Sequence, residues 1–358
     1  MQDPLFPDDP VSERPVQQFP TRTARKVAKS PSSVAPQPPD NTHIKLASAL
    51  PARTWLGTSS WNFPGWAGLV WDGDYAESQL SKYGLAAYAQ NPLFQTVSLD
   101  RAFYRPLTAS QYGAYAAQVG DDFRFVVKGP ALVTDATLRG EKGKAVQPNP
   151  AFLNAELAVQ DFVQPALQGL ASKLGVLVFQ ISPLPAALHS RMPELLHKLA
   201  TMLQALPPLH AHAPDAVIAV EVRDPIWLTP DFVSVLRQSG ATYCLGLHAK
   251  MPPIEDQLPL LRALWPGPLV CRWNLHRMHG AYGYEDAAEL YRPYAKLVHE
   301  DRETRAVLAK VINATTKAGY SAYVTINNKA EGCAPLSVVA LAQEITRLHE
   351  QPGRIKAE

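Results

Sequence analysis

Eight short apolar runs, each followed by a segment with helical periodicity, restrict the fold of this sequence more than any other feature. The runs are residues 54–58, 94–99, 123–127, 175–181, 216–220, 242–247, 268–272 and 321–326. Apolar strands that alternate with helices are typical of a parallel sheet covered by helices. Eight such pairs fit a (β/α)₈ TIM barrel, which typically needs about 250 residues. The sequence therefore predicts the α/β class and a TIM barrel.

An open, doubly wound sheet is the alternative fold. It would be favoured by a glycine-rich phosphate turn after the first strand. The turn here, residues 57–61 (GTSSW), contains a single glycine, so no dinucleotide-binding fingerprint is present.

The helical periodicity predicts the segments that connect the strands. Residues 129–150 show no periodicity and are predicted to be a long loop, and residues 284–318 are predicted to form one long helical segment. The other predicted helices are residues 77–89, 108–119, 150–170, 192–203, 230–238, 257–264 and 335–349.

The first 50 residues differ from the rest in their many prolines among polar residues. Such a composition buries too little apolar surface to offset the entropy of ordering. We expect a tail over residues 1–50, disordered up to about Asn41, then a barrel domain over 51–350 and a short C-terminal tail over 351–358. The tail's basic cluster (Arg22, Arg25, Lys26 and Lys29) is either an arm for a partner or a solvated segment.

Charge and cysteine content limit the class of protein. The net charge of +2 does not require nucleic acid or a membrane surface as a partner. No apolar run approaches the roughly 18–20 residues of a membrane span. The three cysteines lie far apart without a CxxC, which indicates a reducing compartment. We therefore expect a cytoplasmic protein without a membrane partner.

The barrel prediction places polar residues together, because the carboxyl ends of all eight strands face one mouth, where active sites of this fold lie. Glu221 and Arg223 follow the fifth strand in alternate positions, so both side chains are expected on one face. We assign catalytic roles to Glu221, Lys128 and Arg223. The expected substrate-binding residues are Trp61, Asp100, Tyr104, Gln180, Trp227, Arg272, Asn327 and Asn328. This mixture of charges suits an anionic or polyhydroxylated ligand.

Each of these assignments has a structural alternative. Glu221 and Arg223 are alternatively a buried ion pair, and Lys128 a lysine that extends its amine to water. The two tryptophans are alternatively hydrophobic plugs. Gln180 and the two asparagines are alternatively groups that satisfy loops and turns.

A metal site or a cysteine nucleophile is not favoured. His276 and His279 stand in a loop and lack the i, i+4 spacing of a helical metal site, and His248 is the single histidine at a strand end. Cys333 has no histidine beside it to act as a base. We expect no metal and no cofactor.

With these residues in view, the chain resembles the YecE-like family, a bacterial and archaeal domain of unknown function, over about residues 55–345. The resemblance is carried by an ordered set of segments: 57–61 with Trp66, 103–106, 123–128, 180–183, 220–223 with Trp227, Arg272, and 327–328. The family's fold is a TIM barrel, so the resemblance implies the fold that the strand count predicts.

The chain departs from the family pattern at three places. The family has Glu-x-Asn after the second strand, and this chain has Ser98-Leu99-Asp100. Thr134-Asp135 replaces Thr-His after the lysine, and residues 272–275 (RWNL) replace Arg-x-His-Gly. Any proton transfer or metal binding by the missing glutamate and histidines is therefore in doubt here.

Three functions remain open from the sequence. The first is an enzyme for a small anionic, phosphorylated or sugar-like substrate, in which Glu221 acts as acid or base and Lys128 and Arg272 hold the anion. The second is a nucleic-acid-binding or nucleic-acid-processing barrel of the endonuclease type, with tryptophans stacking on bases. The third is an inactive scaffold. A basic strip around the mouth would favour the second, and a closed pocket the first.

Overall fold

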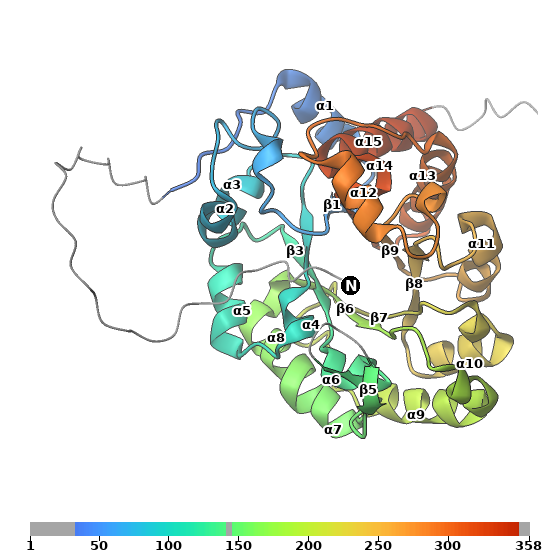
Figure 1. Ribbon diagram of the computed structural model, residues 1–358. Coiled ribbons are helices and arrows are strands. Elements are labelled where there is room, and N and C mark those ends of the chain that lie inside the picture. Colours follow the sequence, from blue (N-terminus) through green and yellow to red (C-terminus); the bar gives the residue numbers. More distant parts are fainter. Residues whose placement is uncertain (1–32, 141–144, 351–358) are drawn as a thin grey trace, which may run out of the picture.

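The computed structural model describes residues 33–140 and 145–350. Within these ranges, eight parallel strands close into a barrel that is surrounded by helices (Figure 1). The barrel strands are β1 (Thr54–Thr58), β2 (Thr96–Leu99), β3 (Arg124–Lys128), β6 (Leu174–Gln180), β7 (Val217–Glu221), β8 (Thr242–Leu247), β9 (Leu269–Trp273) and β10 (Ala322–Ile326). They follow one another around the barrel in chain order, and β10 pairs with β1 to close it. The predicted TIM barrel is therefore confirmed.

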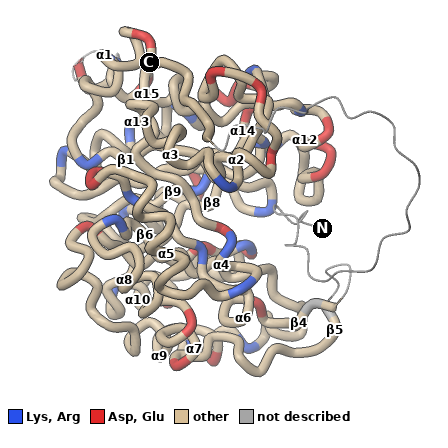
Figure 2. Tube along the Cα trace, turned by 90° about the vertical axis from the view of Figure 1, so that its left-hand side faces the viewer, with Lys and Arg blue, Asp and Glu red and all other residues tan. Residues whose placement is uncertain are grey.

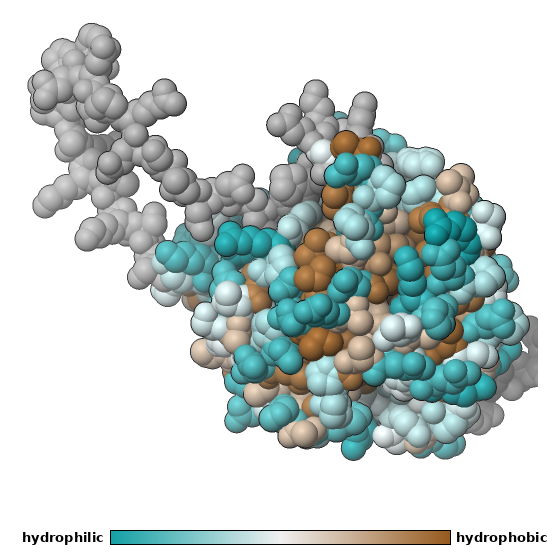
Figure 3. Space-filling view, turned by 90° about the horizontal axis from the view of Figure 1, so that it is seen from below, coloured by the Kyte–Doolittle hydropathy of each residue, from teal (hydrophilic) through white to brown (hydrophobic). Residues whose placement is uncertain are grey.

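The outer helices pack around the barrel and lead from its carboxyl end back to the start of the next strand. They are α2 (Glu77–Tyr83), α3 (Leu85–Tyr88), α5 (Ala109–Ala116), α8 (Gln164–Leu170), α9 (Met192–Gln204), α10 (Pro230–Gln238), α11 (Ile254–Ala263), α13 (Arg302–Lys317) and α15 (Ala334–Glu350). Their outer faces are solvated: the side of the molecule seen in Figure 3 is mainly hydrophilic, with smaller hydrophobic patches between. None of the helices in the described ranges is long and apolar enough to cross a membrane.

Two apolar cores hold the barrel together. The larger one lies between the strands and the helices. The smaller one fills the barrel interior with alternate strand residues, because side chains in a strand alternate between its two faces. The ring of Trp55 stacks on Tyr323, which belongs to this interior core, at 4.7 Å between ring centroids. The next inward positions toward the carboxyl ends are polar, and they form the site.

The connection between β3 and β6 differs from the predicted loop over residues 129–150. It contains α6 (Ala131–Thr134) and an antiparallel pair, β4 (Thr137–Arg139) and β5 (Ala145–Pro148). Before α8, a further short helix, α7 (Ala155–Ala158), continues into a π-helical turn. The hairpin is too short and too polar for its alternation to be visible in the sequence.

The predicted helical segment over residues 284–318 is in fact two helices, α12 (Tyr284–Tyr291) and α13. Pro293 explains the break, since a proline disfavours helical geometry in the residue before it. Arg292 accordingly has an extended ψ of 141°. The segment between the helices, with α12, lies over the carboxyl end of the barrel (Figure 1).

The predicted tail spans residues 1–50, with disorder up to about Asn41, and the structure describes its last part. Residues 33–50 are described and include α1 (Asn41–Ala49), whose first turn is capped by the side chain of Asp40. Leu46 and Leu50 pack against the larger core, and the amide of Gln37 donates to the carbonyl of Val70 at 2.8 Å. The prediction missed these few apolar anchors among the polar residues. Residues 1–32, with the basic cluster, and residues 351–358 lie outside the described residues.

Candidate functional site

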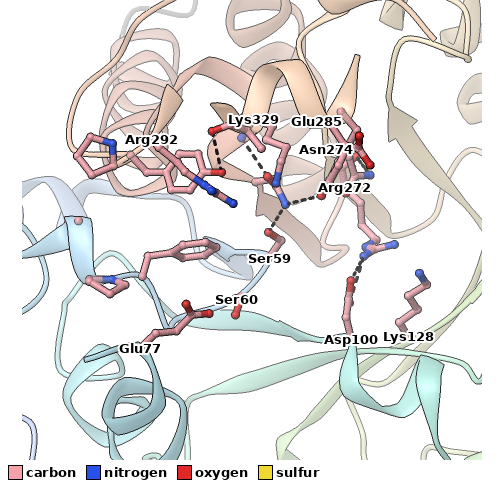
Figure 4. A pocket seen from close by; sticks show the side chains of 18 of the residues that line it. Ser59, Ser60, Glu77, Asp100, Lys128, Arg272, Asn274, Glu285, Arg292 and Lys329 are labelled. Atoms are coloured by element: carbon pink, nitrogen blue, oxygen red, sulfur yellow. Dashed lines mark hydrogen bonds and ion pairs between the residues drawn. The ribbon is translucent and has the colours of Figure 1, made fainter. Parts of the chain in front are cut away.

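A cavity of about 640 Å³ lies at the carboxyl end of the barrel (Figure 4). Most of the predicted site residues line it, although they come from strands far apart in the sequence. These are Asp100, Tyr104, Lys128, Gln180, Arg223, Arg272 and Asn327. The cavity is large enough for a sugar phosphate and lies where active sites of this fold are found.

Glu221 and Arg223 point the same way, as their alternate positions predict. The Arg223 guanidinium lies 2.7 Å from one carboxylate oxygen of Glu221. The other oxygen lies 2.6 Å from Arg272. Glu221 is fully buried and lies beneath the residues that line the cavity. The ion pair that the sequence left as an alternative is therefore present.

Arg272 is the most heavily bonded residue of the cavity floor. Besides Glu221, its guanidinium donates to both carboxylate oxygens of Asp100, at 3.1 and 2.8 Å, and to the side-chain oxygen of Gln180 at 3.1 Å. Gln180 accepts a second hydrogen bond from Arg223 at 3.1 Å. Two arginines, two carboxylates and one amide thus form one network across the barrel.

The charge states in this network follow from burial and pairing. Burial alone would raise the pKa of Glu221, but Arg223 and Arg272 outweigh it and hold the pKa below its ordinary value. Burial alone would lower the pKa of Arg272, and here Asp100 and Glu221 outweigh it and raise the pKa. The carboxylate of Glu221 and the guanidinium of Arg272 both stay ionised at neutral pH.

Lys128 has different surroundings from the arginines. It is only 3% exposed, and its Nζ lies 3.4 Å from the centroid of the Phe103 ring. It has no hydrogen bond or ion pair with any described residue. Burial lowers the pKa of Lys128 to about 7; Asp100 opposes this decrease, and Arg272 and Arg223 add to it. A half-protonated amine therefore faces the cavity at neutral pH.

The other candidate acid, base and nucleophile groups are poorly suited to chemistry. Burial lowers the pKa of His248 to about 3, so its imidazole is neutral, and its Nδ1 accepts from the amide of Lys250. Burial raises the pKa of the Cys333 thiol to about 12. His276 and His279 lie outside the cavity lining, and the described ranges contain no group of three metal-ligating side chains that could hold an ion.

The two asparagines after β10 have separate roles. Asn327 lines the cavity and donates to the Ser59 hydroxyl at 2.8 Å, while its oxygen caps the first turn of α14 (Asn328–Glu331). Asn328 is turned away from the cavity. Its oxygen accepts from the Trp66 indole and from the amide of Ala334. The predicted substrate contact for Asn328 gains no support from this position.

The two predicted stacking tryptophans are buried in the core. The Trp61 indole donates to the carbonyl of Leu80, and its ring meets Tyr115 edge-on. Trp227 is fully buried and packs against Phe232. Neither lines the large cavity. Their position agrees with the alternative of hydrophobic plugs, because both rings pack edge-on against aromatic side chains of the helices and do not line the cavity.

Several cavity residues were not predicted from the sequence. They come from α2, α12, the segment after α12, and α14: Glu77, Tyr284, Glu285, Arg292, Tyr294 and Lys329. Figure 4 shows Arg292 and Lys329 on the side of the cavity opposite Lys128. The Lys329 amine lies 4.2 Å from the centroid of the Tyr284 ring. Their signal in the sequence was weak, because none directly follows an apolar run.

Comparison with solved structures returns barrels of low sequence identity. A DUF72 family protein from Enterococcus faecalis V583 is 16% identical, with 85% of this chain and 97% of that chain covered and a TM-score of 0.51. A second structure of an Enterococcus faecalis V583 DUF72 family protein is 17% identical, with 83% of this chain and 97% of that chain covered and a TM-score of 0.49. A DUF72 family protein from Thermotoga maritima MSB8 is 18% identical, with 83% and 99% covered and a TM-score of 0.47. Comparison with curated proteins gives no match.

A family comparison covers most of the chain. The family described as "Protein of unknown function DUF72" matches residues 55–357, which include every strand of the barrel except the first residue of β1. YecE-like is another name for the same family. On the basis of this match, the chain belongs to the DUF72 family.

Proposed function

We propose that this protein is an enzyme that acts on a small anionic substrate, phosphorylated or sugar-like, at the carboxyl end of its barrel. The observation that carries the proposal is the buried amine of Lys128, which faces a cavity and makes no hydrogen bond or ion pair with a described residue. Burying an amine without a partner destabilises the folded state. A group retained at such a cost in a cavity is a candidate for function.

The cations of the cavity differ in their readiness to bind an anion. Arg272 is already bonded to Asp100 and Glu221, which removes the role expected for it in holding the substrate. The side chain of Arg292 makes no hydrogen bond or ion pair with a described residue, and it points into the cavity (Figure 4). In this proposal Arg292 and Lys329 hold the anion, while Gln180 and Asn327 orient the substrate.

The proposal moves the acid–base role from Glu221 to Lys128. A carboxylate held between two guanidinium groups has a lowered pKa and is a weak base. An amine with a pKa of about 7 exchanges protons efficiently at neutral pH. Glu221 and Arg223 then serve as positioning residues that keep the floor of the cavity rigid around Lys128.

The nucleic-acid alternative has less support. It relies on tryptophans that stack on bases, and Trp61 and Trp227 are buried. Acidic residues of α12 also lie on the same side of the molecule as the basic residues near α4 (Arg101–Tyr104) and α14 (Figure 2). A basic strip around the mouth, which would favour a nucleic acid, is therefore interrupted by acidic side chains in the described part of the chain.

Thermal unfolding with glycerol 3-phosphate tests the proposal. The ligand should raise the melting temperature of the full chain, because it binds only the folded state. Arg292→Gln and Lys329→Gln should each weaken this shift. Lys317→Gln is the matched control, because Lys317 is an exposed cation at the last turn of α13, at the opposite end of the barrel.

Two outcomes would contradict the proposal. A shift that is equal in all three variants would mean that the anion binds elsewhere. A larger shift with a short abasic DNA duplex than with glycerol 3-phosphate would favour the nucleic-acid alternative.

A further inference from the structure

The amine of Lys128 is the nucleophile best placed in this cavity. The buried side chains around it that carry positive charge, Arg223 and Arg272, are both ion-paired. Lys128 instead rests on the face of Phe103, 3.4 Å from the ring centroid, and its amine faces the cavity. Aromatic contact holds the side chain in place without donating to or accepting from the nitrogen. The nitrogen lone pair therefore stays available when the proton leaves.

The environment also sets how often that proton is absent. With a pKa of about 7, about half of the Lys128 amines are unprotonated at pH 7. An ordinary lysine with a pKa of about 10.4 is unprotonated in only about one molecule in 2,500 at this pH. Removal from water and neighbouring cations are the two effects that activate nucleophilic lysines in proteins. Lys128 is subject to both.

The carboxylate of Asp100 lies near the amine, although no ion pair joins the two side chains. Asp100 has the strongest charge interaction with Lys128, and the two side chains come from the neighbouring strands β2 and β3 (Figure 4). The carboxylate is 20% exposed, so it is in contact with the cavity as well as with Arg272. The Ser98 hydroxyl donates to it at 2.6 Å and fixes its orientation.

We propose that Lys128 forms a covalent imine with the carbonyl carbon of an anionic aldehyde or ketone substrate. The nitrogen lone pair attacks the carbonyl carbon, and the carbonyl oxygen takes up a proton to give a carbinolamine. Loss of the nitrogen's proton and of the hydroxyl group as water then gives the imine, so one water leaves for each bond formed. The step needs no oxidant or reductant. It rests on the proposed function, since it uses the same cavity and names its substrate class.

The shape of the cavity supports a substrate with a charge at one end and a carbonyl group at the other. Arg292 and Lys329 lie on the side opposite Lys128 (Figure 4). An anion held there would direct the rest of a small molecule toward the amine. Asp100 would then lie next to the reacting carbon, where it accepts and returns the protons of the carbinolamine step.

Reductive trapping tests this proposal. The full chain is incubated at pH 7 with dihydroxyacetone phosphate or glyceraldehyde 3-phosphate, treated with sodium borohydride, and digested for peptide mass spectrometry. Hydride converts an imine into a stable secondary amine, so the peptide that contains Lys128 should gain the mass of the reduced adduct. Labelling of Lys128 should exceed that of exposed lysines about a thousandfold, given its larger unprotonated fraction. Glycerol 3-phosphate, which has no carbonyl group, should give no adduct and should protect Lys128 by competition.

The competition arm uses the unaltered protein, so the test does not depend on whether a Lys128→Met variant folds. An adduct confined to exposed lysines, with none on Lys128 for either carbonyl probe, would overturn the imine. If glycerol 3-phosphate still raises the melting temperature in that case, the proposed function stands and only the imine fails. If neither an adduct nor a thermal shift appears, both proposals fail together.

Discussion

Arg272 on β9 and Glu221 on β7 are joined by a 2.6 Å ion pair across a strand that lies between them. The intervening strand β8 has Gly246 at this level, where a Cβ atom would lie 3.4 Å from Glu221 Oε1. The glycine leaves the inward position open, so the two side chains meet inside the barrel. The pair fixes the floor of the cavity, because Arg272 also binds Asp100, the residue directly after β2.

Replacing Arg272 with methionine should destabilise the protein by about 3–5 kcal/mol, because Glu221 and Asp100 then lose a buried partner. Urea unfolding measures the change. The double variant Arg272→Met/Glu221→Gln should recover part of the loss, because it removes one unpaired charge. Equal stability of Arg272→Met and the unaltered protein would show that the network contributes nothing to folding.

Replacing Lys128 with methionine should stabilise the protein in a pH-dependent way. The ordinary pKa of lysine is 10.5, and the pKa of Lys128 in the folded protein is about 7. Below pH 7 this lysine is therefore protonated in both the folded and the unfolded chain, and the full cost of burying its charge destabilises the folded state. Between about pH 7 and 10.5 the unfolded chain binds more protons than the folded one. The stability of the unaltered protein relative to the variant therefore rises there by up to about 1.4 kcal/mol per pH unit.

Urea unfolding of both proteins from pH 6 to pH 10 checks this. The advantage of Lys128→Met should be largest at pH 6 and should shrink as the pH rises. An advantage that does not change with pH would mean that the lysine titrates normally.

Two neighbouring substitutions should shift the pKa of Lys128 in opposite directions. Asp100→Asn removes a charge that raises this pKa, so it should fall by about one unit. Arg223→Gln removes a charge that lowers it, so it should rise by a similar amount. The measurement is the rate of Lys128 carbamylation by cyanate against pH, read from peptide masses, with the exposed Lys45 as internal reference. Shifts in the same direction would contradict the assigned charge interactions.

Gly65 should be required for the close approach of the segment that carries Arg292. A Cβ atom at Gly65 would lie 1.7 Å from the carbonyl oxygen of Pro293, so Gly65→Ala must displace that segment. We expect a loss of about 1–3 kcal/mol in stability and a weaker thermal shift with glycerol 3-phosphate. The control is Gly73→Ala, since a Cβ atom there meets nothing within 4 Å. Identical behaviour of the two variants would remove this role from Gly65.

The strands could be predicted from the sequence because each is a short apolar run. The helices between them could be predicted because their apolar residues recur at helical spacing. Period-two geometry also predicted that Glu221 and Arg223 share a face, and the 2.7 Å contact between them confirms it. The hairpin of β4 and β5 was missed because its strands are short and polar. The break at Pro293 was missed although a proline inside a helical pattern indicates one.

The sequence by itself determined that polar groups such as Asp100, Lys128 and Arg272 follow buried strands, since strand ends in a closed barrel share one mouth. Only the tertiary structure decided which of these groups is paired. Arg272 lies within hydrogen-bond distance of Asp100 and Glu221, whereas the Lys128 amine rests on the Phe103 ring and makes no hydrogen bond or ion pair with a described residue. The tertiary structure also places Trp61, Trp227 and Asn328 outside the cavity lining, and it adds Arg292 and Lys329 to that lining. Pairing and burial depend on distances between residues remote in the chain, and those distances arise only when the barrel closes.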